Sequence, residues 1–251
     1  MTLRGRITRL PFSTGNANLP KLVVYDTSDV LADILAWPTL RCFFDFSNRA
    51  TMTESGGLVV SITDLTGHYT ATAAVGARGA YNLDAHNGQP GLTCDGNQKY
   101  VVPSLFPATE RFSVAAAVKA TDATSTSRVF FADASDGNVN YFTLADQIRF
   151  ISGDVNLNVP SLRHRMVNMI ATADYVTDAC SLYSDGLSAT ATTTRAGPNG
   201  DANIAAWNDA NTGGKFIGSL GYLAVFDEDL THNATLRGLM DEYALRRWRL
   251  M

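Results

Sequence analysis

The residues best suited to chemistry lie in one polar, glycine-rich segment, GPNGDANIAAWNDANTGG, at residues 197–214. This segment places the aromatic ring of Trp207 among amides and a carboxylate, those of Asn203, Asn208, Asp209 and Asn211. A ring beside hydrogen-bonding groups is a combination that binds sugars, because the ring stacks on the apolar face while the polar groups bond the hydroxyls. The alternative is a strand over Ile204–Trp207 whose tryptophan packs inward and whose polar neighbours only form the next turn.

Catalytic chemistry has weaker support. Glycoside hydrolysis needs two carboxylates that flank the scissile bond, and no two of the four glutamates share a predicted strand: Glu54, Glu110, Glu228 and Glu242. In the acidic run FDEDL, residues 226–230, neighbouring side chains of a strand would point to opposite faces. The sequence also lacks G-x-S-x-G, H-E-x-x-H and P-loop motifs. We therefore expect no enzymatic activity and no catalytic residue.

Metal and cofactor sites are not expected either. The cysteines are odd in number and unclustered, which indicates buried free thiols in a reducing compartment: Cys42, Cys94 and Cys180. Zinc is not predicted, because there is no C-x-x-C and the four histidines are scattered. Four aspartates allow either turn capping, which we favour for the first two, or calcium ligation: Asp45, Asp64, Asp227 and Asp229.

The first two dozen residues have no hydrophobic period. RLPFSTGNANLPKL, residues 9–22, contains two prolines and few apolar side chains, so burial cannot offset an ordering entropy of roughly 1–2 kcal/mol per residue. The chain has a net charge of −4, yet residues 1–22 carry four positive charges and no acid, so the net charge of the remaining chain is near −8. We predict that Met1–Val24 is an attachment arm, ordered against a partner through Arg4, Arg6, Arg9, Leu10, Phe12, Leu19, Lys21 and Leu22. A tail without a role is the alternative.

Nucleic acid and membranes are not expected as partners. The four positive charges of the arm are thinly spread and not interleaved with aromatic residues, unlike a nucleic-acid arm. No apolar run approaches the roughly 18 residues that span a bilayer. The N-terminal arginines are not followed by an apolar segment, so no signal peptide is predicted.

The body of the chain is predicted to be all-β between two helices. Helices are expected at residues 29–37 and 233–248, where apolar side chains recur at i, i+3 and i+4. Between them, many short apolar runs are separated by Gly, Asn and Asp turns, which is typical of a sandwich or barrel. Strands are predicted at residues 40–46, 58–65, 91–94, 112–119, 128–132, 147–151, 166–171, 180–183, 202–207 and 216–226. YSDGL, residues 183–187, is predicted to form a hairpin turn.

In this order, the segments resemble the laminin-G-like, concanavalin A-like jelly-roll domains of phage and bacterial surface proteins. The resemblance begins with the apolar-Asp motifs at Phe44–Ser47 and Ile62–Gly67. It continues through NGQPGLTCDGNQKYV, FSVAAAVKA and LYSDG, ends with the strand and helix FIGSLGYLAVFDEDLTHNATLRGLMDEYALRRW, and covers Trp37 to Trp248. The family often has a glutamate early in the last helix, where this chain has Ala234, so Thr231 and the acids before it are expected to cap that helix.

The resemblance implies an antiparallel β-sandwich jelly roll over residues 37–251, preceded by an extended arm with a short helix at residues 1–36, and ending in one α-helix. Glucanases of this superfamily carry two glutamates on one strand, which this chain lacks. The implied function is a non-enzymatic virion subunit of a bacteriophage, a capsid decoration or tail-associated protein. It would assemble in the host cytoplasm as a homo-oligomer on other virion proteins. The alternative is a carbohydrate-binding or host-receptor-binding module that contacts cell-surface glycans.

Overall fold

The computed structural model describes residues 26–106, 111–121, 128–134, 140–144, 147–150, 155–158, 165–192, 197–198, 200–206 and 216–248. No helix in these ranges is long and apolar enough to cross a membrane. Two sets of predicted site residues lie outside the described ranges. These are the arm residues Arg4, Arg6, Arg9, Leu10, Phe12, Leu19, Lys21 and Leu22, and the loop residues Trp207, Asn208, Asp209 and Asn211.

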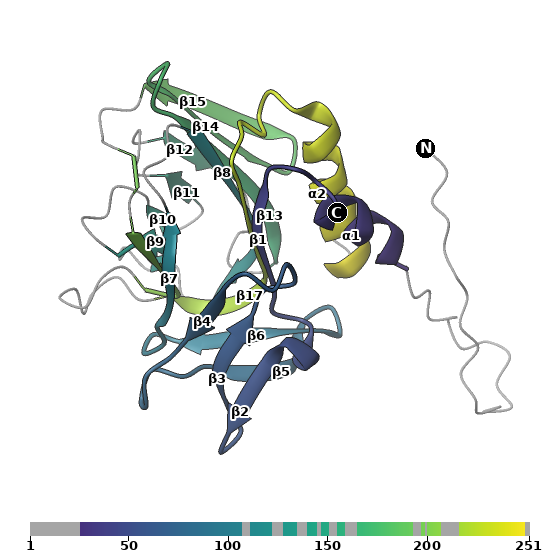
Figure 1. Cartoon of the computed structure of the whole chain (residues 1–251), viewed down its shortest axis with the longest axis vertical. Coiled ribbons are helices and arrows are strands. Elements are labelled where there is room, and N and C mark those ends of the chain that lie inside the picture. The colour runs from purple at the N-terminus through teal and green to yellow at the C-terminus, as the bar shows by residue number, and fades with distance from the viewer. Residues whose placement is uncertain are drawn as a thin grey trace, which may run out of the picture.

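The described strands form two antiparallel sheets that face each other (Figure 1). The first sheet runs in the spatial order β15 (Leu187–Thr192), β14 (Ala179–Ser184), β13 (Val167–Asp174), β8 (Arg111–Ala120), β17 (Ile217–Phe226), β6 (Gln89–Asp95) and β5 (Ala80–His86), and β1 (Leu40–Asp45) also pairs with β17. The second sheet runs in the order β12 (Val155–Asn158), β11 (Gln147–Phe150), β10 (Asn140–Leu144), β9 (Arg128–Asp133), β16 (Gly200–Ile204), β7 (Tyr100–Phe106), β4 (Thr70–Thr72), β3 (Leu58–Thr63) and β2 (Met52–Ser55). The predicted antiparallel β-sandwich is confirmed.

The main core fills the space between the two sheets. Phe106 from the second sheet packs edge-on against Phe112 of β8, with ring centroids 5.5 Å apart, and lies 5.9 Å from Phe131. All three rings are buried. All three cysteines are buried thiols outside any disulfide, as predicted. Burial of these apolar surfaces, at about 25 cal/mol per Å², is the main force that holds the sheets together.

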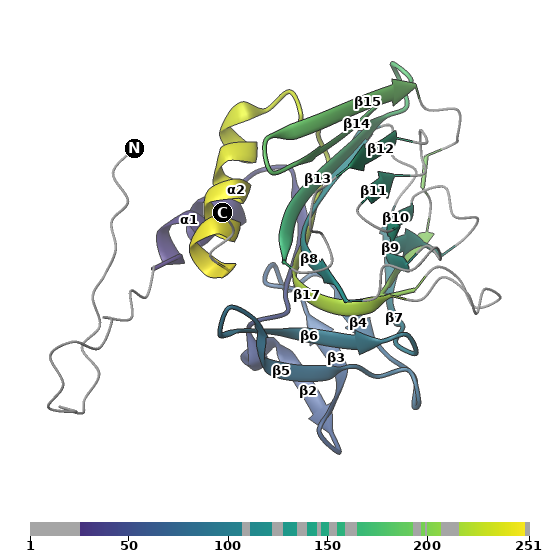
Figure 2. The same ribbon diagram turned by 180° about the vertical axis from the view of Figure 1, so that it is seen from behind.

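A second core lies on the outer face of the first sheet, where α1 (Ser28–Leu35) and α2 (Ala234–Trp248) cover it (Figures 1 and 2). Phe43 of β1 stacks on Tyr222 of β17 with centroids 5.4 Å apart, and Tyr243 of α2 meets Phe43 edge-on. Trp248 packs 5.7 Å from Tyr222. A Cβ at Gly221 would come within 2.7 Å of the Trp248 ring, so glycine permits this close approach.

The turns follow the chemistry of their residues. Asp64 accepts hydrogen bonds from the backbone amides of Thr66 at 2.9 Å and Tyr69 at 2.7 Å, and Asp45 accepts one from Ser47 at 2.9 Å. Both aspartates therefore cap turns, as predicted. The predicted hairpin also forms, between β14 and β15. Its two central residues have positive φ angles, 52° at Asp185 and 80° at Gly186, as a tight primed turn requires.

The start of α2 differs from the prediction. The cap is Asn233, whose Oδ1 accepts a hydrogen bond from the Leu236 amide at 3.1 Å. The predicted cap, Thr231, instead donates its hydroxyl to Asp229. Thr231 lies in the turn before the helix. It is therefore too far from the first backbone amides of α2, which have no acceptor within the helix, to cap them.

Removing the largest side chain of the second core should destabilise the fold. Trp248→Ala should lower the free energy of unfolding by about 3–5 kcal/mol, because it leaves a cavity between helix and sheet. Leu245, on the same helix, is 40% exposed, so Leu245→Ala should cost less than about 1 kcal/mol. Denaturant titration followed by circular dichroism measures both values, and equal losses would contradict the docking of α2 through Trp248.

Candidate functional site

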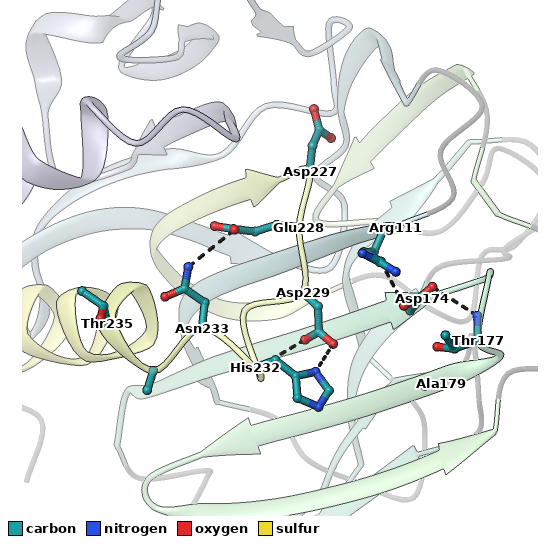
Figure 3. A pocket seen from close by; sticks show the side chains of 11 residues that line it. Arg111, Asp174, Thr177, Ala179, Asp227, Glu228, Asp229, His232, Asn233 and Thr235 are labelled. Atoms are coloured by element: carbon teal, nitrogen blue, oxygen red, sulfur yellow. Dashed lines mark hydrogen bonds and ion pairs between the residues drawn. The ribbon is translucent and has the colours of Figure 1, made fainter.

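A cleft of about 710 Å³ opens where α2 begins (Figure 3). One wall is the loop between β17 and α2, residues 227–233, and the other is formed by the ends of β8, β13 and β14. This volume lies within the range of about 300–1,000 Å³ that is usual for ligand pockets. The lining residues are Arg111, Asp174, Thr177, Ala179, Asp227, Glu228, Asp229, His232, Asn233, Ala234 and Thr235.

Two buried hydroxyls hold the β17–α2 loop in place. Ser113 Oγ, on β8, donates to the Glu228 carbonyl at 2.6 Å and accepts from the Leu230 amide at 2.9 Å. Thr172 Oγ1, on β13, lies 2.6 Å from Ser113 Oγ. Because Ser113 has a single hydroxyl proton and gives it to the carbonyl, Thr172 is the donor in the second bond. The loop backbone is therefore fixed to the sheet, with Leu230 buried in the second core and Glu228, Asp229 and His232 lining the cleft.

Asp229 and His232 form a pair at the mouth of the cleft (Figure 3). His232 Nδ1 contacts Asp229 Oδ2, and Asp229 Oδ1 accepts the Thr231 amide at 2.8 Å. Burial opposes ionisation of Asp229, but the hydrogen bonds from Thr231 and His232 outweigh it and lower its pKa. When the imidazole is neutral and carries its proton on Nδ1, Nε2 is a hydrogen-bond acceptor. The His232 side chain is 85% exposed, so this atom is open to a ligand.

Arg111 and Asp174 form the opposite wall. They are directly paired across β8 and β13, and Arg111 Nε donates to Asp174 Oδ2 at 2.9 Å. Burial opposes ionisation of Asp174, but the Val176 and Thr177 amides and the Arg111 charge prevail and lower its pKa. The Arg111 side chain is 49% exposed. Its Nη atoms meet no acceptor among the described residues, so they remain donors for a ligand.

The floor between these walls is also polar. Glu228 accepts hydrogen bonds from Trp37 Nε1 at 2.6 Å and from Asn233 Nδ2 at 3.5 Å. Asp227 pairs with Arg41 at the edge of the cleft. The described residues include no cluster of three or more histidine, cysteine, aspartate or glutamate side chains that is arranged to hold a metal ion. What the cleft offers is a set of fixed donors and acceptors, which suits a ligand rich in hydroxyl groups.

This cleft is not the site that the sequence predicted. Of the predicted sugar contacts, only Asn203 is described, and it is fully buried in β16, away from the surface. The contribution of Arg111 and Asp174 depends on the pairing of two distant strands, which a linear pattern does not reveal. From the sequence, the acids of FDEDL are expected to help cap the last helix; in the structure, Asp227, Glu228 and Asp229 line the cleft.

No family model and no curated protein matches this chain. Among solved structures, it is similar to domain 4 of the GH43 arabinanase AbnA from Geobacillus stearothermophilus in complex with arabinotriose. The TM-score is 0.56 at 17% identity, over 81% of this chain and 97% of that chain. It also matches Trypanosoma rangeli sialidase in complex with 2,3-difluorosialic acid, with a TM-score of 0.58 at 15% identity over 86% of this chain. A structure described as a receptor binding domain matches with a TM-score of 0.51 at 9% identity, over 84% of this chain and 53% of that chain.

These likenesses establish the β-sandwich fold and correct one prediction. The chain spans about a third of the sialidase, 34% of its length. The expectation that the chain is not an enzyme is contradicted, because the matched structures include parts of an arabinanase and a sialidase, so the fold is related to enzymes. The missing glutamate pair excludes only the glucanase arrangement on one strand. None of these three matched structures is described as a phage protein.

The wall at Asp174 should make stability depend on acid pH. A lowered pKa means that Asp174 stabilises the fold above its unfolded pKa of about 3.9, and that this contribution is lost as the pH falls through the lower folded value. Asp174→Asn keeps an oxygen for the Val176 and Thr177 amides but cannot ionise. The variant should therefore have a lower Tm than the wild type at neutral pH. When the pH is lowered, its Tm should fall less than that of the wild type. Parallel Tm curves for both proteins below pH 4 would contradict this account.

Proposed function

We propose that this chain binds carbohydrate in the cleft between β8, β13 and the start of α2. The observation on which the proposal rests is the set of fixed donors and acceptors around Arg111, Asp174 and the Asp229–His232 pair. The arabinanase domain supports it, since that domain is described in complex with arabinotriose and matches over 97% of its length. At 17% identity this likeness concerns the fold, so the location of the site is argued from the cleft.

The charges of the cleft favour a neutral sugar. Asp174 and Asp227 are each paired with an arginine. Glu228 and Asp229 have no arginine or lysine partner among the described residues; their contacts are neutral donors and His232. These two carboxylates would repel an anionic sugar and accept hydrogen bonds from neutral hydroxyls. The proposed ligands are therefore neutral sugars, in contrast to the sialic acids named for the sialidase structures.

The sequence resemblance adds a narrower proposal. According to this narrower proposal, the glycan belongs to a host cell surface, and the arm Met1–Val24 attaches the chain to a phage particle. A structural match that is described as a receptor binding domain is compatible with this role. The phage context itself rests on the resemblance of the sequence motifs alone.

Glycan binding should depend on the exposed arginine of the cleft. Arg111→Gln should weaken binding of a neutral oligosaccharide about tenfold or more, because hydrogen bonds to charged groups contribute about 1.5–3 kcal/mol. Arg49→Gln is the matched control, since Arg49 also pairs with a carboxylate, that of Glu54, and is exposed in the short 3-10 helix Arg49–Thr51, just before β2 of the other sheet. A glycan array followed by calorimetry on the best neutral ligand measures both effects. Equal affinities of the two variants, or no glycan bound by the wild type, would contradict the proposal.

The sugar contact predicted from the sequence, Trp207, is tested separately. If the cleft is the site, Trp207→Ala should leave glycan affinity unchanged. A loss of binding at an unchanged Tm would instead place the contact on the Trp207 ring. If the ring belongs to the core, the same substitution should cost about 3–5 kcal/mol in the free energy of unfolding. Calorimetry and thermal denaturation of the same variant distinguish these outcomes.

A further inference from the structure

A second groove, of about 300 Å³, continues from the cleft across the outer face of β13, β14 and β15. The two hollows share Ala179, Asp229 and His232 as lining residues, so the Asp229–His232 pair stands at their junction. The remaining lining residues of the groove are Thr172, Cys180, Ser181, Leu182, Tyr183, Ser188, Thr190, Ala191, Thr231 and Arg237.

The groove has a row of hydroxyls along its floor. Strand pairing places Thr172 opposite Ser181, and Ser181 opposite Thr190. These side chains point outward, because Cys180 and Leu182, which flank Ser181 on β14, face the core between the sheets. Neighbouring strands are about 4.8 Å apart, so the row crosses the strands at regular intervals. The Ser181 and Thr190 hydroxyls can both donate and accept a hydrogen bond, as the hydroxyl groups of a sugar do, whereas Thr172 is buried and gives its proton to Ser113.

The side wall of the groove is aromatic and fixed. Tyr183 is directly opposite Ser188 and donates its hydroxyl to Asp241 at 3.0 Å. The Arg237 guanidinium lies 5.2 Å from the centroid of the Tyr183 ring, and its Nη1 donates to the Thr231 carbonyl at 3.0 Å. The wall therefore keeps its shape without a ligand, which reduces the entropy lost on binding.

We infer that the groove extends the carbohydrate site, so that the ligand is a neutral chain of several sugars rather than a single sugar. One end of the chain occupies the cleft, and the chain passes the Asp229–His232 pair and continues across β13, β14 and β15 over the hydroxyl row. Thr190, at the far end of the row, contacts only the longer ligands. This inference rests on the proposed function, since it assigns a length and a direction to the ligand of the same site.

The test is the dependence of affinity on ligand length. Linear arabino-oligosaccharides and cello-oligosaccharides, from the disaccharide to the hexasaccharide, are titrated by calorimetry. The wild type should bind longer chains more tightly. Thr190→Val, which keeps the shape of the side chain and removes the hydroxyl, should weaken binding of the hexasaccharide roughly threefold to tenfold and leave the disaccharide unaffected. Thr53→Val, at an exposed position on β2 of the other sheet, is the matched control and should change neither.

The outcomes separate the two proposals. If Arg111→Gln weakens every length, while affinity does not increase with length and Thr190→Val behaves like Thr53→Val, the cleft binds sugar and the extension is wrong. If the wild type binds no oligosaccharide of either series, the extension and the proposed function fail together for these ligands. Thr190 is exposed on an edge strand, so Thr190→Val should leave the Tm unchanged. The Tm of each variant serves as the control that it is folded.

Discussion

The structure depends on one constraint, which is that the first sheet is apolar on both faces. Its central strands β8, β13 and β17 are buried almost throughout, so each face must be covered. The second sheet covers one face, and α2 with α1 covers the other. To bring α2 onto the outer face, the chain leaves β17 and turns back over the ends of β8 and β13. The cleft is the space that this turn leaves beside the strands.

Polar groups inside the second core fix the orientation of the helix. Asn168, near the start of β13, accepts a hydrogen bond from the Tyr222 hydroxyl and donates to Asp241 of α2 at 2.8 Å. Asp241 also accepts from Tyr183, and burial raises the pKa of its carboxyl. Leaving any of these buried groups unpaired would cost about 1–3 kcal/mol. A shift of α2 along the sheet would break the chain of bonds, so the helix has one position and the loop before it has one path.

The sequence predicted the centre of the fold better than its edges. Each of the ten predicted strands overlaps an observed strand, because buried strands have strong apolar patterns. Seven of the described strands were missed: the four at the ends of the two sheets, β2, β5, β12 and β15, and three inside the second sheet, β4, β7 and β10. An edge strand packs less apolar surface, and LSATAT in β15 has little hydrophobic contrast. The cleft was not predicted for a related reason, since Arg111 and Asp174 meet only through the β8–β13 register.

The way the loop is anchored leaves its cleft-lining side chains free to vary. Ser113 holds the loop through the Glu228 carbonyl and the Leu230 amide, and these backbone groups are present whatever the side chains are. The side chains of Glu228, Asp229 and His232 can therefore differ without loss of this anchor. Structures that share the fold at 9–17% identity need not share the chemistry of this loop. At the proposed site, ligand choice would thus depend on a few side chains on a fixed backbone, and it has to be argued from them rather than from the sandwich.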